Sequence, residues 1–452
     1  MPIDVVILAA GQGSRMKSSL PKVLHPLAGR PMIQHLLDTV KQLNDARIHL
    51  IVGHGADQVQ KALEGQKINY VFQHEQLGTG HAVAQSLPSL GDGPVLMLNG
   101  DAPLLSLKTL ERLSKGLDSD QLTLLSVMQD DPTGYGRIVR NAEKQVVAIV
   151  EQKDASPEQL AIHECNTGLM ATTGRLLKEW LPRLKPENAQ GEYYLTDIVG
   201  MAHQDGTSLT AIQAECVEEV SGVNDRRQLS VLERWYQQRQ ADRAMADGAT
   251  LVDPSRFDQR GTLTLGRDVF IDVGCIFEGD VILEDNVHIG PYCVIRHSHI
   301  GAGSHIDAYS HIDNARAEGD NRVGPFARLR PAAHLERSAH IGNFVEIKKA
   351  TIGTETKVNH LSYIGDAKVG KGTNIGAGSI TCNYDGVNKH VTEIGDRAFI
   401  GSNSVMVAPI SIGNDSFVAA GSTLTDSVGD GVLAIGRSRQ VVKEGWKRPG
   451  DE

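Results

Sequence analysis

The chain has 452 residues, of which 40% are hydrophobic and only 4% aromatic, and its formal charge at pH 7 is −10. Because this length exceeds what a single hydrophobic core usually organises, two domains are expected. The net negative charge argues against a general surface for nucleic acid or membranes, since both attract basic proteins.

Targeting signals and disulfides are not expected either. The apolar run Val5–Ala10 is too short for a signal peptide or a transmembrane segment, and no longer apolar run follows. Five scattered cysteines offer neither a disulfide framework nor metal-site spacing: Cys165, Cys216, Cys275, Cys293 and Cys382. We therefore expect a cytoplasmic protein that does not associate with membranes.

Short apolar segments within residues 1–225 alternate with helix-like stretches such as Met32–Leu43. The expected strands are Val5–Ala10, Ile48–Val52, Val95–Leu98 and Leu122–Val127. This alternation predicts a Rossmann-like α/β fold with a mainly parallel sheet. Ligands of such sheets bind at the carboxyl ends of the strands, so the residues that follow strands are candidates for a site.

The first candidate is the glycine-rich turn Leu8–Met16, which includes Gly11, Gly13 and Arg15. Glycines after a strand let backbone N–H groups approach a phosphate, and an arginine adds positive charge. However, Met16 stands where a dinucleotide fingerprint has its third glycine, and no Walker A lysine follows. The turn alone leaves phosphate binding and a structural role both open.

The second candidate is Asp101, which follows the apolar residues 96–98. One carboxylate at a strand end, with phosphate oxygens and waters, is enough to hold Mg²⁺. In the alternative interpretation Asp101 caps a helix that starts near Pro103.

A helix is expected next, followed by a different fold. The segment Arg226–Gly248 is rich in Gln, Arg and Ala and lacks proline, which favours a helix between two domains. From Leu265 to about Leu424 an aliphatic residue returns every sixth position, starting with Leu265, Ile271, Phe277, Leu283, Ile289 and Ile295. This period predicts an all-β left-handed parallel β-helix of hexapeptide repeats, in which each hexapeptide forms one side of a triangular coil.

The coil geometry brings residues eighteen apart onto one face, separated by about 4.8 Å. Arg330 and Lys348 form such a pair, each one residue after an aliphatic anchor. Two stacked cations suggest a site for an anion such as phosphate, while a solvated surface is the alternative. Near Cys382 the repeat is interrupted, so the segment Asn383–His390 must leave the coil as a loop.

A further segment, Leu20–Leu24 with Lys22 at its centre, resembles the signature of sugar-nucleotide pyrophosphorylases. Additional motifs are Gly78–Ala82, Thr133–Arg137, Val150–Asp154, Asn166–Gly168, Gly191–Asp197 and Gly222–Asn224. With the hexapeptide repeats, they make essentially the whole chain similar to the bacterial bifunctional uridylyltransferase/acetyltransferase family that makes UDP-N-acetylglucosamine. The resemblance implies a uridylyltransferase domain at 1–226, a helical linker at 227–247 and an acetyltransferase domain at 248–452. It also implies a homotrimer.

For the N-terminal domain, the resemblance implies a site for UTP, N-acetylglucosamine 1-phosphate and Mg²⁺. The residues implied to bind UTP are Leu8, Ala9, Ala10, Gly11, Lys22, Gln73, Gly78, Thr79, Asn99, Gly100 and Asp101. Those implied to bind the sugar phosphate are Gly136, Glu151 and Asn166, and Asp101 and Asn224 are implied to bind Mg²⁺. Arg15 and Lys22 are suited to stabilise the charge that develops on the leaving pyrophosphate.

For the C-terminal domain, the resemblance implies acetyl transfer from acetyl-CoA to glucosamine 1-phosphate. His360 would be the general base and Glu346 would orient it. The implied sugar-phosphate residues are Arg330, Lys348, Tyr363 and Asn374, and those implied for acetyl-CoA are Ala377, Asn383, Tyr384, Ser402, Ala420 and Arg437.

Two alternatives remain at this point. The β-helix could regulate or oligomerise a single-activity sugar nucleotidyltransferase, or it could display loops to a protein partner. The cation pair, His360 and the Asn383–His390 loop count against both alternatives, because a passive scaffold needs none of them.

Overall fold

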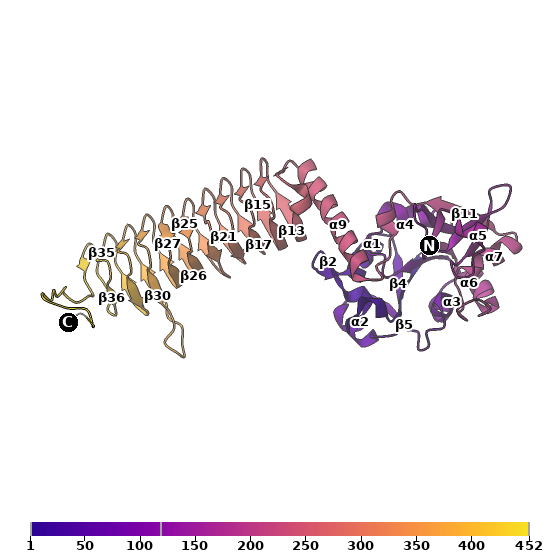
Figure 1. Ribbon diagram of the computed structural model, residues 1–452, viewed down its shortest axis with the longest axis horizontal. Helices are drawn as coiled ribbons and strands as arrows, with labels where there is room; N and C mark the ends of the chain where they lie inside the picture. Colours follow the sequence, from indigo (N-terminus) through magenta and orange to yellow (C-terminus); the bar gives the residue numbers. More distant parts are fainter. Residues whose placement is uncertain (1, 118–119, 451–452) are drawn as a thin grey trace. The chain divides into compact units, whose positions relative to one another are not determined.

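The computed structural model describes residues 2–117 and 120–450, and the chain divides into two compact units, Met1–Tyr236 and Gln237–Glu452. The first unit is an α/β sheet with helices around it, and the second is a stack of short parallel strands in successive coils (Figure 1). None of the helices within the described ranges has both the length and the hydropathy of a transmembrane span.

The sheet of the first unit is mainly parallel, as the sequence predicts. Its main path is β11-β7-β10-β6-β1-β4-β5, and the exception is β10, which runs antiparallel to β6 and β7. The strands are β1 (Ile3–Ala9), β4 (Ala46–Val52), β5 (Asn69–Phe72), β6 (Pro94–Asn99), β7 (Gln121–Met128), β10 (Glu164–Thr173) and β11 (Ser208–Gln213), with β8 (Arg137–Arg140) and β9 (Val146–Val150) attached to β10.

Helices cover this sheet because its strands are apolar on both faces. Val5 and Ile7 of β1 belong to one buried cluster, whereas Val6 between them belongs to another, as alternation along a strand requires. The helices are α1 (Met32–Val40), α2 (Ala56–Ala62), α3 (Thr79–Ala84), α4 (Leu107–Ser114), α5 (Pro157–Leu160), α6 (Gly174–Trp180), α7 (Asp197–Gln204) and α8 (Val217–Val220).

Helix α9 (Arg226–Ala246) occupies the segment for which the sequence predicts a helix. Its first part packs on the first unit, where Leu232 is buried beside Met16, Leu27 and Val223. In its second part, Gln237 exchanges hydrogen bonds of 2.7 and 3.1 Å with the backbone of Gln259.

The second unit is the predicted parallel β-helix. Strand pairs in successive coils are parallel and mostly shifted by seventeen or eighteen residues, as in Phe270↔His288 and Ile341↔Val358, whereas the inserted loop raises the shift to twenty-five in Ile375↔Ile400. The longer strands are β13 (Asp258–Leu265), β15 (Ile276–Leu283), β25 (His340–Asn343), β26 (Glu346–Ile352), β27 (Lys357–His360) and β28 (Tyr363–Val369).

The six-residue period marks the core of these coils. Anchors from Ile271 to Val418 are at most 3% exposed, and Leu265 at the start of the repeat is partly buried against them. The positions four residues after the anchors are also buried, including Cys275 and Cys293, which stack in adjacent coils. Each hexapeptide therefore contributes two side chains to the core.

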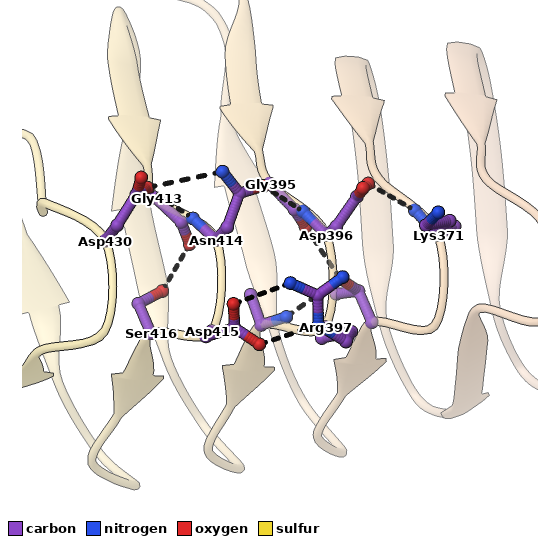
Figure 2. A network of polar contacts seen from close by, with 11 residues as sticks. Lys371, Gly395, Asp396, Arg397, Gly413, Asn414, Asp415, Ser416 and Asp430 are labelled. Atoms are coloured by element: carbon purple, nitrogen blue, oxygen red, sulfur yellow. Dashed lines mark hydrogen bonds and ion pairs between the residues drawn. The ribbon is translucent and has the colours of Figure 1, made fainter.

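Polar side chains tie the last coils together at one corner (Figure 2). Asp430 Oδ1 accepts from the Asn414 N–H at 2.7 Å, Asn414 Oδ1 accepts from the Asp396 N–H at 2.8 Å, and Asp396 Oδ1 accepts from the Lys371 N–H at 3.0 Å. A glycine must precede Asp396, since a Cβ at Gly395 would stand 2.7 Å from Asn414 Oδ1. The corner thus satisfies backbone donors that the strands leave unpaired.

Replacing Ile341 with alanine is expected to open the β-helix locally. Ile341 is fully buried in the stacked core, and a large-to-small change at such a site costs about 2–5 kcal/mol. Hydrogen exchange should show lost protection in β25 and β27, while Arg322→Ala, at an exposed position of the neighbouring coil, should change little. Unchanged exchange around Ile341 would contradict the assignment of the anchors as core.

Candidate active sites

A cavity of about 360 Å³ lies at the carboxyl ends of β1, β5 and β6. It collects residues that the sequence resemblance assigns to UTP binding: Leu8, Ala9, Ala10, Gly11, Lys22, Gln73, Gly78, Thr79, Asn99 and Asp101. Glu192 of the Gly191–Asp197 motif also lines it, as does Gln76, which belongs to none of the predicted motifs. The carboxyl edge of a parallel sheet is where such folds bind ligands.

Backbone contacts bring the lining segments together. Leu8 pairs with Asn99 across β1 and β6, and the Gly100 N–H donates to the Leu8 carbonyl at 2.9 Å. Gln73 follows β5, and its Nε2 donates to the Gly78 carbonyl at 3.1 Å. These contacts hold three segments around the same cavity: the glycine-rich turn, the Asp101 segment and the Gly78 turn.

Four polar side chains converge beside this cavity. Lys22 Nζ forms an ion pair with Asp101 Oδ2 and lies 3.3 Å from Asn224 Oδ1. Arg15 donates to the same Asn224 oxygen at 2.8 Å. The Val223 N–H donates to the Asp101 carbonyl at 2.9 Å, which places Asn224 next to Asp101 although they are far apart in sequence.

The helix-cap interpretation of Asp101 is wrong. Helix α4 begins at Leu107, and its cap is Ser106, whose hydroxyl accepts from the Thr109 N–H at 3.2 Å. The Asp101 side chain instead lines the cavity, where it is ion-paired with Lys22.

Asp101 and Asn224 provide only a few oxygen atoms that could bind a metal ion: one carboxylate and one amide oxygen. In the described part of the chain no three His, Cys, Asp or Glu side chains cluster as a metal site would require. One carboxylate and one amide oxygen fit a Mg²⁺ ion that is also held by phosphate oxygens and waters, because Mg²⁺ dehydrates reluctantly and needs few protein ligands. They do not fit a closed structural metal site.

The three residues assigned to the sugar phosphate also meet. The Asn166 N–H donates to the Gly136 carbonyl at 2.8 Å, and a Cβ on Gly136 would stand 3.3 Å from the Glu151 carboxylate. Thr196, not singled out as a site residue, donates to Glu151 Oε1 at 3.3 Å. Burial raises the pKa of Glu151 above its ordinary value, and the nearby carboxylates of Asp154 and Asp197 add to this effect.

Replacing Glu151 with glutamine is expected to stabilise the first unit at neutral pH. Because burial raises the pKa of Glu151, the folded state loses stability as pH rises through that pKa, and a neutral amide avoids this loss. Denaturation midpoints should therefore favour the variant at pH 7 and converge with the wild type under acid conditions. A variant that is less stable at pH 7 would show that the ionised carboxylate is well solvated.

In the β-helix, Arg330 and Lys348 lie on neighbouring coils, as their spacing predicts. Arg330 follows β23 (Arg328–Leu329), and its N–H donates to the Ile347 carbonyl of β26 at 2.8 Å. A third cation, Lys389, lies close to Lys348. Contact with the Lys389 ammonium lowers the pKa of Lys348, and burial and the Arg330 charge lower it further. Lys389 belongs to the loop that interrupts the repeat, so spacing along the coil could not reveal it.

The partner of His360 differs from the expectation. Its Nδ1 lies 2.7 Å from Asn343 Oδ1, whereas Glu346 forms ion pairs with Arg330 at 2.8 Å and with Arg328 at 3.5 Å. Glu346 was expected to orient the imidazole, but the guanidinium groups in its column compete for its carboxylate more strongly than a histidine does. Because an amide oxygen only accepts, the proton lies on Nδ1, and Nε2 is the nitrogen that can take up a proton.

The loop Asn383–His390 leaves the coil after β30 (Ile380–Cys382), as the sequence predicts (Figure 1). At its base, Asn383 Nδ2 contacts the carboxylate of Asp366 and lies 3.5 Å from the Tyr363 hydroxyl. Within the loop, the Asp385 carboxylate accepts from two backbone N–H groups and the His390 ring, which together lower the pKa of Asp385. The loop is therefore a preformed hairpin next to Tyr363.

Three of the residues assigned to acetyl-CoA stack in successive coils. The Asn403 N–H donates to the Ala377 carbonyl at 2.7 Å, and the Gly421 N–H donates to the Ser402 carbonyl at 2.8 Å. Ala377, Ser402 and Ala420 thus occupy equivalent places in three successive coils. Asn374 starts β29 (Asn374–Ile375), Tyr384 is exposed on the loop, and Arg437 lies in the exposed C-terminal segment.

Comparison with protein families matches each unit. Residues 5–243 match a MobA-like NTP transferase domain, which covers more than half of the chain. Residues 263–297 match the bacterial transferase hexapeptide, and residues 391–426 match the hexapeptide repeat of succinyl-transferase.

Full-length relatives are also found. Proteins named bifunctional protein GlmU from Chromohalobacter salexigens, Marinobacter nauticus and Stutzerimonas stutzeri are 58%, 55% and 54% identical to this chain over 449 residues, and each match covers 99% of both chains. Because these matches extend over nearly the whole chain at more than 50% identity, the chain belongs to the family of bifunctional GlmU proteins.

Proposed function

We propose that each unit carries one of two consecutive reactions of UDP-N-acetylglucosamine synthesis. Residues 1–226 transfer uridylyl groups, residues 248–452 transfer acetyl groups, and residues 227–247 join them. What carries the proposal is that one chain combines the Lys22–Asp101–Asn224 constellation with the stacked Arg330 and Lys348 and with His360, which Asn343 contacts. Full-length similarity to bifunctional relatives disfavours a β-helix that only regulates or displays loops.

In the first unit, the phosphate of N-acetylglucosamine 1-phosphate attacks the α-phosphorus of UTP, and pyrophosphate leaves. No covalent protein intermediate is needed, so the residues act by in-line positioning and charge neutralisation. Arg15 and Lys22 neutralise the leaving pyrophosphate, while Glu151 and Asn166 hold the sugar. Asp101 and Asn224 would hold Mg²⁺, which supplies further charge stabilisation when bound.

In the second unit, the amine of glucosamine 1-phosphate attacks the thioester carbon of acetyl-CoA. The new C–N bond replaces the C–S bond, His360 Nε2 takes the amine proton, and that proton then neutralises the leaving thiolate. Arg330 and Lys348 hold the sugar phosphate, Tyr363 and Asn374 contact the sugar, and the Ala377 backbone meets the thioester oxygen. The stack of Ser402 and Ala420 with Asn383, Tyr384 and Arg437 would hold coenzyme A.

The direct test measures both reactions on the purified chain. Glucosamine 1-phosphate and acetyl-CoA should release free thiol, and UTP with N-acetylglucosamine 1-phosphate should release pyrophosphate. Pyrophosphate release without any thiol release would mean a single-activity nucleotidyltransferase with a passive β-helix.

We further propose a cytoplasmic homotrimer that acts on small molecules and does not bind nucleic acid or membranes. The five cysteines, all within the described residues, are free thiols, which suits a reducing compartment. Tyr292, Tyr309, Phe326 and Phe344 stack along one corner while 44–55% exposed, which is the kind of apolar surface that neighbouring copies cover. Light scattering should give three times the 48.8 kDa chain mass, and a monomeric mass would contradict the assembly.

A further inference from the structure

The Lys22 ammonium contacts the two side-chain oxygens to which the proposed metal ion would bind. Its ammonium is ion-paired with the Asp101 carboxylate and lies 3.3 Å from the Asn224 amide oxygen. Both side chains of the ion pair are largely buried, with 16% of Lys22 and 20% of Asp101 exposed. A cation bound to the same two oxygens would compete with this ammonium at close range.

The charges around the cavity are already balanced before any ligand enters. Asp101 and Glu192 supply two negative charges, and Lys22 and Arg15 supply two positive charges, since Arg15 also contacts Asn224. A divalent cation added alone would leave two positive charges in excess in a partly desolvated site, where repulsion is weakly screened. A nucleoside triphosphate brings enough negative charge to remove that excess.

Lys22 is also placed to change partners. Its side chain lines the same cavity as Gly11 and Thr79, which belong to the two segments assigned to the triphosphate. A lysine ammonium is a compact charge on a flexible stem, so it can leave a carboxylate for a phosphate without movement of the backbone. Arginine, with its rigid planar fork, would exchange less readily.

We propose that Lys22 is an exchangeable cation that holds the metal site closed until nucleotide binds. In the nucleotide-free protein it neutralises Asp101 and keeps Asp101 and Asn224 together. When the triphosphate enters, Lys22 transfers to the phosphates, and only then do the two oxygens become available to a divalent cation. This inference rests on the proposed roles of Asp101 and Asn224, and it adds an order of binding in which free metal does not load first.

The test measures Mn²⁺ binding to the full chain by electron paramagnetic resonance, without UTP and with it. The wild type should bind Mn²⁺ weakly without UTP, and Lys22→Met should bind it at least about tenfold more tightly, because the competing charge is gone. Lys61→Met removes one exposed lysine of α2 and should behave as the wild type. Equal or weaker Mn²⁺ binding by a folded Lys22→Met variant overturns the proposal.

Further variants separate this inference from the proposed function. Lys22→Met/Asp101→Asn should lose the gain in affinity, since the freed site needs the carboxylate. If Asp101→Asn still binds Mn²⁺ in the presence of UTP, the metal assignment fails and the exchange fails with it. If Asp101→Asn loses that binding while Lys22→Met gains nothing without UTP, only the exchange is wrong. If circular dichroism shows that Lys22→Met is unfolded, Lys22→Gln replaces it, because it removes the same charge and keeps a polar side chain. Its Mn²⁺ affinity without UTP should then exceed that of the wild type, and an equal or lower affinity overturns the proposal.

Discussion

Replacing Asp101 with alanine is expected to abolish UTP turnover and to leave acetyl transfer unchanged. The Asp101 carboxylate pairs with Lys22 next to Asn224, so its loss removes the anchor for both the ammonium and the proposed cation. We expect kcat/KM for pyrophosphate release to fall by at least about 10³-fold, equivalent to ~4 kcal/mol of transition-state stabilisation. Pyrophosphate and thiol release are measured on the same preparation.

The matched control is Glu111→Ala, which removes an exposed carboxylate from α4 in the same unit. It should retain both activities. Thiol release serves as the internal control for Asp101→Ala, because a generally unfolded chain would lose it as well. Normal uridylyl transfer by Asp101→Ala would rule out the proposed role.

The second large effect is expected for His360→Ala, which should remove thiol release and spare pyrophosphate release. General base catalysis typically contributes 10²–10⁴-fold, and the loss should fall in that range, roughly 3–5 kcal/mol. The reason is that Nε2 of His360 is the nitrogen left to accept the amine proton when Asn343 holds Nδ1. Retained thiol release would mean that another group is the base.

Two companion variants define this role. His305→Ala removes an exposed histidine from an earlier coil and should leave thiol release unchanged. Asn343→Leu removes the acceptor for Nδ1, so it should slow thiol release by about tenfold through loss of ring orientation and should alter its pH profile. If Asn343→Leu leaves both the rate and the pH profile unchanged, Asn343 does not position His360.

Much of the site was accessible from the sequence because the chain repeats. In the β-helix each coil adds the same translation, so a sequence separation of eighteen places two residues on neighbouring coils, and the sequence alone predicts the pairing of Arg330 with Lys348. In the first unit, parallel strands end at one edge, so the segments after β1, β5 and β6 could be expected to share a cavity. The family resemblance then supplied the roles.

The sequence could not predict contacts between side chains whose separation along the chain is not set by the repeat. Asn343, not Glu346, contacts His360, because Arg328 and Arg330 of the preceding coil compete for Glu346. Lys389 reaches Lys348 from a loop outside the repeat.

The sequence by itself therefore determined the two folds, their order and the strand ends where chemistry could occur, because hydrophobic periodicity is a local property of the chain. Only the tertiary structure decided that Lys22 rests on Asp101 and Asn224, the latter 202 residues away. Which charges neutralise one another in a buried site depends on three-dimensional proximity and desolvation, and neither is encoded by spacing along a non-repeating chain.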